Sequence, residues 1–320
     1  MSRRVAFVFP GQGSQAVGMG VALAAAYPEA EATLAEAEAA FAGAANGGPA
    51  VSLRAMLNDG PEDLLTLTEH AQPAILAVSV AAARVLTAHG IQPAFVAGHS
   101  LGEYSAHVAA GTFSLADGVA IVRRRGRYMQ ESVPVGTGAM AAVLGLEAAL
   151  VEQACREAAE GDVVSAANLN APGQVAIAGG TAAVARASER AKALGARRVV
   201  PLTVSAPFHC ALMKPAQDRL EPELRALAAC PPRVPVVANV DAEPKRDSAA
   251  GVDALVRQVS ATVRWQDVVE RLAAEGVSTF VEVGPGTVLA GLIKRIRKDA
   301  HVVSFSGPDQ LDAVRAACSS

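Results

Sequence analysis

The residues most suited to chemistry lie in the segment VAGHSLGEYS (96–105), where Ser100 stands between Gly98 and Gly102. An apolar run, AFVAG, precedes the serine, and a helix-forming run, LGEYSAHVAA, follows it. A G-x-S-x-G segment between a strand and a helix is typical of a nucleophile elbow, a tight turn that presents the serine hydroxyl. The free N–H groups of the following helix, among them that of Leu101, would favour a tetrahedral oxyanion beside the serine. The segment therefore predicts acyl transfer, either to water or to another acceptor.

A serine nucleophile needs a base, and histidine is the usual one. Two of the six histidines occupy suitable positions. His209, in SAPFHCALM, follows a predicted strand and lies in a proline-containing loop before a helix. His301 has the late position expected in the Ser–Asp–His order of hydrolases, although it opens a β-run where a solvated strand edge also explains it. The other four histidines are less suited, because they lie in helical runs (His70, His89, His107) or on the wrong side of the elbow (His99). Between the two candidates, the residues alone favour His209 only slightly.

A glycine-rich loop, FPGQGSQ (9–15), follows the first predicted strand. It does not match the dinucleotide pattern G-x-G-x-x-G, because Ala16 occupies the third glycine position. We instead expect the backbone of this loop and the amide of Gln12 to face the serine from a neighbouring strand end.

A basic run, RRRGRYMQ (123–130), lies in a helical stretch. Successive helix positions are about 100° apart, so Arg123, Arg124 and Arg125 cannot all face one way. A solvated basic face is the common explanation for such a run. An arginine that points inward would need an anionic partner, and a substrate carboxylate with bidentate geometry would supply one.

The elements around these segments indicate an α/β fold. Short β-rich runs alternate with alanine-rich helical runs along the 320 residues, which favours a largely parallel sheet. The sequence predicts strands at VAFVF and PAFVAG and near 234–238, 279–283 and 301–305, and helices around 16–42, 70–89 and 115–131.

A different order begins after the Pro- and Gly-rich break ESVPVGTG (131–138). The runs from AMAAVLG to RRVVPLTV follow the order β-α-β-β-α-β, which is the ferredoxin-like pattern. We therefore predict a small subdomain over 134–205, inserted into a discontinuous large subdomain of 1–133 and 206–320.

Composition narrows the class of protein. Hydrophobic residues make up 51% of the chain and charged residues 18%, as in a globular protein. The net charge of −3 gives no general attraction to nucleic acid. The four cysteines have neither CxxC nor metal-ligand spacing. The apolar run at the N-terminus is too short for a signal peptide, and no stretch approaches the length of a membrane span. These observations predict a cytoplasmic protein without a metal site.

Several segments together resemble one family, the malonyl-CoA:acyl-carrier-protein transacylases of dissociated fatty-acid synthesis, related to polyketide synthase acyltransferase domains. The similarity extends over about residues 4–298 and implies an α/β-hydrolase-like core with an inserted ferredoxin-like subdomain. The segments that carry it are FPGQGSQ, GHSLGEYS, RRRGRYMQ, NLNAPGQVAIAG, SAPFHCALMKP, ALVRQ and FVEVGPG.

The resemblance implies a role for individual residues. Ser100 matches the acylated nucleophile, and His209 matches the general base. The family orients this histidine through a backbone carbonyl, here at Gln258, and uses no carboxylate third member. Arg125 matches the arginine that binds the free carboxylate of malonate. The other matches are the oxyanion hole (Gln12 and the N–H of Leu101) and residues that line the site (Asn170, His99, and Phe208, whose bulk goes with malonyl selection).

The implied substrates are malonyl-CoA and holo-acyl carrier protein, with no cofactor, and a monomer is expected. The acidic carrier protein is expected to dock on basic residues near the cleft, with Lys192, Arg197, Arg198, Lys294, Arg295 and Arg297 as candidates. Three alternatives remain open: an esterase or thioesterase that uses Ser100, His301 and either Asp299 or Glu282; a binding scaffold with a silent serine; and a family member serving polyketide synthesis or malonate decarboxylation.

Overall fold

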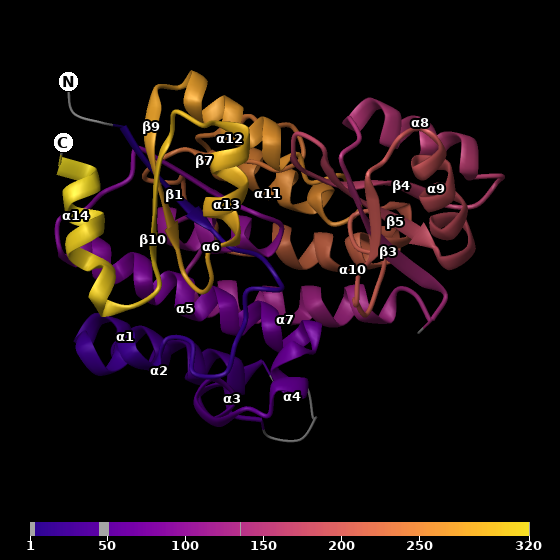
Figure 1. The fold of residues 1–320 in the computed structure, drawn as a ribbon. Coiled ribbons are helices and arrows are strands. Elements are labelled where there is room, and N and C mark those ends of the chain that lie inside the picture. Colours follow the sequence, from indigo (N-terminus) through magenta and orange to yellow (C-terminus); the bar gives the residue numbers. More distant parts are fainter. Residues whose placement is uncertain (1–3, 45–50, 135, 320) are drawn as a thin grey trace.

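Two β-sheets organise the chain, and each forms the centre of one lobe (Figure 1). The computed structural model describes residues 4–44, 51–134 and 136–319. The first three residues of the N-terminal stretch and Val135 in the predicted break lie outside the described residues.

The large lobe contains a six-stranded sheet with the order β10-β9-β1-β2-β7-β8. All neighbouring strands in it are parallel except β7 and β8, which form an antiparallel pair. The bounds of its strands are β1 (Arg4–Phe9), β2 (Phe95–Gly98), β7 (Val236–Val237), β8 (Pro244–Lys245), β9 (Val277–Val283) and β10 (His301–Phe305).

The central strand β1 shows why this sheet is buried on both sides. Val5, Phe7 and Phe9 contribute to one hydrophobic core, whereas Ala6 and Val8 contribute to a second. Alternate residues of a strand point to opposite faces, so helices cover both faces of the sheet. The helices of the large lobe, some of which pack on other helices and not on the sheet, are α1 (Val21–Ala26), α2 (Pro28–Gly43), α3 (Leu53–Asp59), α4 (Glu62–Thr66), α5 (Thr68–Ala88), α6 (Leu101–Ala110), α7 (Leu115–Glu131), α10 (Lys214–Arg225), α11 (Ser248–Gln258), α12 (Trp265–Ala274), α13 (Val288–Ile296) and α14 (Leu311–Ser319).

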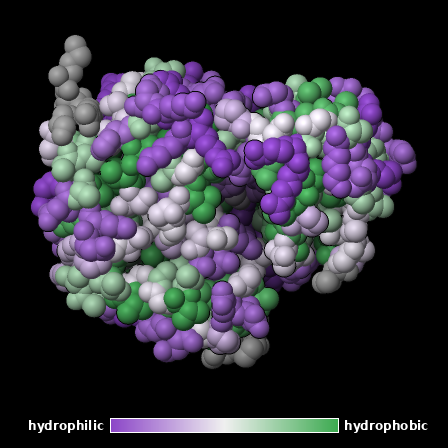
Figure 2. Space-filling view, in the orientation of Figure 1, coloured by the Kyte–Doolittle hydropathy of each residue, from purple (hydrophilic) through white to green (hydrophobic). Residues whose placement is uncertain are grey.

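The small lobe contains an antiparallel sheet with the order β4-β5-β3-β6. Its elements follow one another as β3 (Gly138–Leu144), α8 (Ala148–Ala158), β4 (Val164–Ala171), β5 (Gln174–Gly180), α9 (Thr181–Ala193) and β6 (Arg198–Pro201). A short bridge between Asn168 and Val263 connects β4 to the large lobe. Figure 2 shows a hollow in the surface between the two lobes.

The prediction of a mixed α/β fold with a mostly parallel sheet is confirmed. The expectation that no stretch approaches the length of a membrane span is wrong, because α5 is long and apolar enough to cross a membrane by length and composition. However, 83% of its most apolar window is buried inside the protein, as expected for the core helix of a globular fold.

Candidate active site

The strand β2 and the helix α6 meet in a tight turn at Ser100. Its backbone has φ 52° and ψ −109°, a conformation that residues with a side chain rarely adopt. The two flanking glycines permit the close packing of this turn. A Cβ on Gly98 would lie 1.9 Å from the Gly102 carbonyl carbon, and a Cβ on Gly102 would lie 2.0 Å from the carbonyl oxygen of Phe9. The G-x-S-x-G spacing is therefore a steric requirement of the elbow.

Asn239, which follows β7, holds the elbow from the neighbouring strand. Its Oδ1 accepts a hydrogen bond from the backbone N–H of Ser100 at 2.7 Å, and its Nδ2 donates to the carbonyl of Gly98 at 2.7 Å. Asn239 is fully buried, so this pair of hydrogen bonds is shielded from water. The strained turn is thus fixed on both sides of the nucleophile.

His209 contacts the serine hydroxyl directly. The Ser100 Oγ lies 2.6 Å from Nε2, and Nδ1 lies 3.0 Å from the backbone carbonyl of Gln258. A carbonyl oxygen only accepts, so Nδ1 carries the proton and Nε2 of the neutral ring is free to accept from the serine. This is the arrangement of a nucleophile with its general base.

Burial is the main cause, and the nearby charge of Arg125 the second, of a pKa of His209 that is lowered to about 3. The imidazole is therefore neutral across the physiological range. A neutral imidazole can accept the serine proton, which is what a base must do before the nucleophile attacks.

Arg125 projects from α7 into the site and is buried, with an exposure of 2%. Its Nη2 donates to Ser100 Oγ at 3.2 Å and to Gln258 Oε1 at 3.0 Å, and its Nη1 donates to Gln72 Oε1 at 2.8 Å. All three acceptors are neutral, and no carboxylate among the described residues lies within ion-pair distance of the guanidinium. A buried charge without a counterion is costly, so this arrangement favours an anionic ligand next to the serine.

The basic run of α7 separates as its helical spacing predicts. Arg123 lies over the ring of Phe41, 3.9 Å from its centroid, and Arg124 forms an ion pair with Glu223 at 2.8 Å. Only Arg125 of the three faces Ser100.

The glycine-rich loop after β1 brings Gln12 to the opening between the lobes. Its Nε2 donates to Thr68 Oγ1 at 3.2 Å, which leaves the second N–H of the amide available. Gln12 shares a cavity of about 270 Å³ with His99 and Asn170, whose side chains are joined by a 2.8 Å hydrogen bond from His99 Nε2 to Asn170 Oδ1. Two of the predicted lining residues, His99 and Asn170, therefore lie together with Gln12, and Asn170 belongs to the small lobe.

Two further predicted residues lie beside the dyad. Leu101 is the first residue of α6, and its N–H has no acceptor within the parts of the chain that the structure describes. Phe208 is half-buried, immediately before His209, and packs against the core of both lobes.

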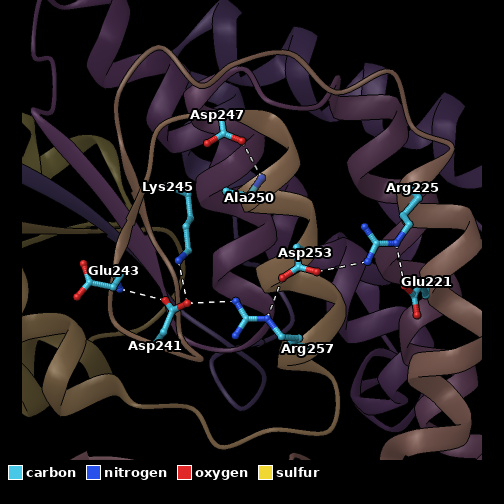
Figure 3. Close-up of polar contacts among 9 residues, drawn as sticks. All are labelled: Glu221, Arg225, Asp241, Glu243, Lys245, Asp247, Ala250, Asp253 and Arg257. Atoms are coloured by element: carbon cyan, nitrogen blue, oxygen red, sulfur yellow. Dashed lines mark hydrogen bonds and ion pairs between the residues drawn. The ribbon is translucent and has the colours of Figure 1, made fainter.

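A chain of ion pairs on the surface supports the segments that carry Asn239 and Gln258 (Figure 3). Asp241, two residues after Asn239, accepts from Arg257 at 3.1 Å, and Arg257 directly precedes Gln258. Exposed pairs contribute little individually, but a network fixes geometry better than an isolated pair. The network continues from the loop after β7 through α11 to α10 and comprises Lys245, Asp241, Arg257, Asp253, Arg225 and Glu221.

The alternative base His301 is wrong. It is the exposed first residue of β10, whereas Ser100 comes after the end of β2 in the same sheet. Because these strands run parallel, His301 and Ser100 lie at opposite ends of the strands. The acids proposed with it are also engaged elsewhere. Asp299 pairs with Arg297 at 2.7 Å, and Glu282 accepts from the N–H groups of Leu289 and Ala290 at the start of α13.

Three buried polar residues of the site were not predicted from the sequence: Gln72, Glu103 and Asn239. Glu103 carried the clearest signal, because it is the one charged residue that a nearly apolar helix places one turn after the nucleophile. Gln72 and Asn239 belong to no recognisable spacing.

Comparison with known proteins agrees with this geometry. The acyl transferase domain family matches residues 6–317, so the class of protein is an acyltransferase. The malonyl CoA-acyl carrier protein transacylase of Escherichia coli (strain K12) is 53% identical over 309 residues, 96% of this chain and 97% of that protein. The chain belongs to the family of malonyl CoA-acyl carrier protein transacylases.

Solved structures give the same result. The acyl carrier protein S-malonyltransferase of Vibrio cholerae is 48% identical, with a TM-score of 0.93 over 97% of this chain and 99% of that one. A malonyl-transacylase in complex with its type II PKS acyl-carrier protein is 45% identical, with a TM-score of 0.92 over 97% of this chain and 98% of that one.

Proposed function

We propose that the protein transfers the malonyl group of malonyl-CoA to the phosphopantetheine thiol of acyl carrier protein, for fatty-acid synthesis, through a malonyl ester on Ser100. One observation carries this proposal. The Ser100 hydroxyl lies between a neutral imidazole at 2.6 Å and a buried guanidinium at 3.2 Å that has no carboxylate partner among the described residues. The imidazole suits attack on a thioester, and the guanidinium suits an acyl group that ends in a carboxylate.

In the first half-reaction His209 Nε2 accepts the serine proton while Ser100 Oγ forms a bond to the thioester carbon. The C–S bond then breaks, and the imidazolium returns the proton to the CoA sulfur. The free N–H of Leu101 and the second amide N–H of Gln12 are the donors proposed for the oxyanion.

In the second half-reaction the same groups act on the carrier thiol. His209 accepts the thiol proton, the sulfur attacks the ester carbon, and the C–O bond to Ser100 breaks with return of the proton to the serine. A thioester is consumed and a thioester is formed, so the exchange is nearly balanced in free energy. We propose that it needs no metal or cofactor.

Arg125 and Phe208 are the proposed selectivity residues. The fork of Arg125 would bind the malonyl carboxylate, and the ring of Phe208 would crowd an α-methyl branch. A single methyl group is discriminated by only about 1–3 kcal/mol, so we expect the arginine to give the larger selection.

The finer description of the fold belongs to this proposal. The strand order β4-β5-β3-β6 with α8 and α9 supports a ferredoxin-like small subdomain over 134–205. The strand–Ser100–α6 elbow in a largely parallel sheet supports an α/β-hydrolase-like core formed by 1–133 and 206–320. We further propose a monomer that acts in the cytoplasm.

The acidic carrier protein is proposed to dock on basic residues beside the cleft. Arg197, Arg198 and Lys294 are exposed and have no ion-pair partner in the described parts of the chain. Lys192 and Arg297 already pair with Glu189 and Asp299. The Arg295 Nη1 reaches Gln174 at 2.8 Å, which places the end of α13 beside the small lobe.

The test is covalent labelling. Incubation with malonyl-CoA should add one malonyl group to the wild type, detected by intact-mass spectrometry, and none to the Ser100→Ala variant. Subsequent holo-acyl carrier protein should remove the adduct and appear as malonyl-carrier. A binding scaffold would give no adduct, and an esterase would release free malonate in place of loaded carrier.

A further inference from the structure

Glu103 is a buried carboxylate that the proposed mechanism does not use. It lies in the first turn of α6, three residues after the nucleophile, and is fully buried. Its Oε1 has no hydrogen-bond partner within the described residues. A buried carboxylate with an unpartnered oxygen is costly. The presence of Glu103 in the core therefore indicates a compensating role for its other oxygen.

That other oxygen, Oε2, holds two donors. It accepts from the backbone N–H of Asn239 at 2.9 Å and from Gln258 Nε2 at 2.8 Å. Burial raises the pKa of Glu103 to about 7, partly offset by these hydrogen bonds and by the charge of Arg125, whereas the charge of Asp241 acts in the raising direction. An Oε2 acceptor is present in both the ionised and the protonated carboxyl group.

The contact with Gln258 fixes the orientation of its side-chain amide. Nε2 donates one proton to Glu103 and the other to the carbonyl of Ser100, also at 2.8 Å. The amide oxygen must then face the opposite way, where it accepts from Arg125 Nη2 at 3.0 Å. An inverted amide would place N–H groups against the guanidinium, which has no acceptor to offer.

The same Nη2 of Arg125 donates to Ser100 Oγ, so hydrogen bonds connect Glu103, Gln258, Arg125 and the nucleophile without a gap. We propose that Glu103 is a positioning residue, which orients the Gln258 amide and thereby holds the Arg125 guanidinium where it can receive the free carboxylate of a malonyl group. This inference rests on the proposed function.

The general base depends on a different part of Gln258. His209 Nδ1 donates to the backbone carbonyl, whose position is set by the last turn of α11 and not by the side-chain amide. Loss of the Glu103 acceptor should therefore impair the loading of an acyl group with a carboxylate more than the loading of an acetyl group.

Two substitutions separate the acceptor from the charge. Glu103→Leu fills a similar volume but offers no acceptor. Glu103→Gln keeps an oxygen at the position of Oε2, which receives both hydrogen bonds, and places its NH₂ where the unpartnered Oε1 lies. Rescue by Gln is expected only if the acceptor is what matters.

The experiment measures acylation of Ser100 by malonyl-CoA and by acetyl-CoA, from time courses of intact mass. In Glu103→Leu we expect kcat/KM for malonyl-CoA to fall at least about 10-fold, mainly through KM, while acetyl loading stays within about 3-fold. Glu103→Gln should bring both rates to within about 3-fold of the wild type. The matched control is Glu38→Leu, which removes another carboxylate acceptor, here of the Arg54 N–H at 2.7 Å, on α2 outside the site; its malonyl-to-acetyl ratio should equal that of the wild type.

The inference is overturned if Glu103→Leu lowers both rates equally, if it lowers neither, or if Glu103→Gln is as impaired as Glu103→Leu. Should far-UV circular dichroism show that Glu103→Leu does not fold, Glu103→Asp withdraws the carboxylate by one methylene and must show the same malonyl-selective loss. A wild type that forms no malonyl adduct would refute the proposed function itself, whereas wild-type loading with an unchanged ratio in Glu103→Leu refutes only this inference.

Discussion

Replacement of Arg125 by alanine should convert a malonyl-selective site into one that no longer prefers malonyl over acetyl. The guanidinium is buried, and within the described residues its hydrogen bonds to Gln72, Gln258 and Ser100 all go to neutral oxygens. A malonyl carboxylate that enters the variant would lose its only charged partner in a site shielded from water.

The magnitude follows from the burial of this pair. Truncation of one partner of a buried, hydrogen-bonded charge pair costs about 2–5 kcal/mol, which corresponds to roughly 30- to 5,000-fold in kcat/KM for malonyl-CoA. Acetyl-CoA brings no charge and loses only the 3.2 Å contact of the arginine with Ser100 Oγ. We therefore expect acetyl loading to change by less than about 10-fold in either direction.

Single-turnover acylation, followed by intact mass with each donor separately, measures both rates in one format. Arg125→Lys is the matched control, because it keeps the positive charge but not the planar fork, and its malonyl rate should lie between those of the wild type and Arg125→Ala. Equal losses with malonyl-CoA and acetyl-CoA in Arg125→Ala would refute the assignment of this arginine to the substrate carboxylate.

Further expectations concern the base, its pH dependence, the buried carboxylate and the elbow. His209→Ala should slow malonyl adduct formation by about 10²–10⁴-fold, whereas His301→Ala at the opposite end of the strands should leave it unchanged; comparable losses in both variants would contradict the dyad. Because the pKa of His209 is lowered to about 3, the rate of adduct formation should show no inflection near pH 6.5 over the pH range in which the protein stays folded. An inflection there would count against the buried neutral imidazole. The pKa of Glu103 is raised to about 7, so its contribution to stability is present below pH 4.5 and is lost as the pH rises through 7; urea denaturation should show Glu103→Gln gaining roughly 2–3 kcal/mol on the wild type between pH 5 and pH 8, and a constant difference would be incompatible with this. Gly102→Ala should destabilise the fold by several kcal/mol because its Cβ meets a carbonyl oxygen, whereas Gly291→Ala, with open space around it, should be neutral or stabilising by up to about 1 kcal/mol in thermal denaturation; similar effects at both glycines would refute the steric argument.

Local patterns in the sequence predicted the elements that carry the site. The run 115–131 was expected to be helical and is α7, and the elbow was expected between a strand and a helix, as β2 and α6 are. The predicted helix around 16–42 is instead two helices, because Pro28 begins α2 and lacks the N–H that would continue the preceding helix. Helices α3 and α4 were not predicted, since each is too short to show a clear periodicity.

The site could be predicted only where one segment contains the whole signal. Ser100 lies within its own motif, but its base is 109 positions away, and the residues alone did not decide between His209 and His301. The decision depends on which distant segment the tertiary fold brings to Ser100: His209 reaches it from the loop after β6, whereas His301 begins β10 at the other end of the parallel strands. The same reason explains why Asn239 was missed: it is brought to the elbow by the pairing of β7 with β2, and nothing in its own segment indicates that contact.

The surroundings of His209 differ from those of the histidine in a hydrolase triad. A hydrolase triad strengthens its histidine with a carboxylate, whereas here Nδ1–H meets a neutral carbonyl, and burial and Arg125 keep the pKa of His209 low. Of the two acceptors that could attack a malonyl ester on Ser100, a thiol with a pKa of about 8.5 gives up its proton more readily than water at about 15.7. If a malonyl carboxylate pairs with Arg125 as proposed, it would balance the positive charge that contributes to the lowered pKa of His209, so we expect a stronger base in the loaded enzyme. In the proposed mechanism, the arginine would thereby couple recognition of the acyl carboxylate to activation of the thiol that removes it.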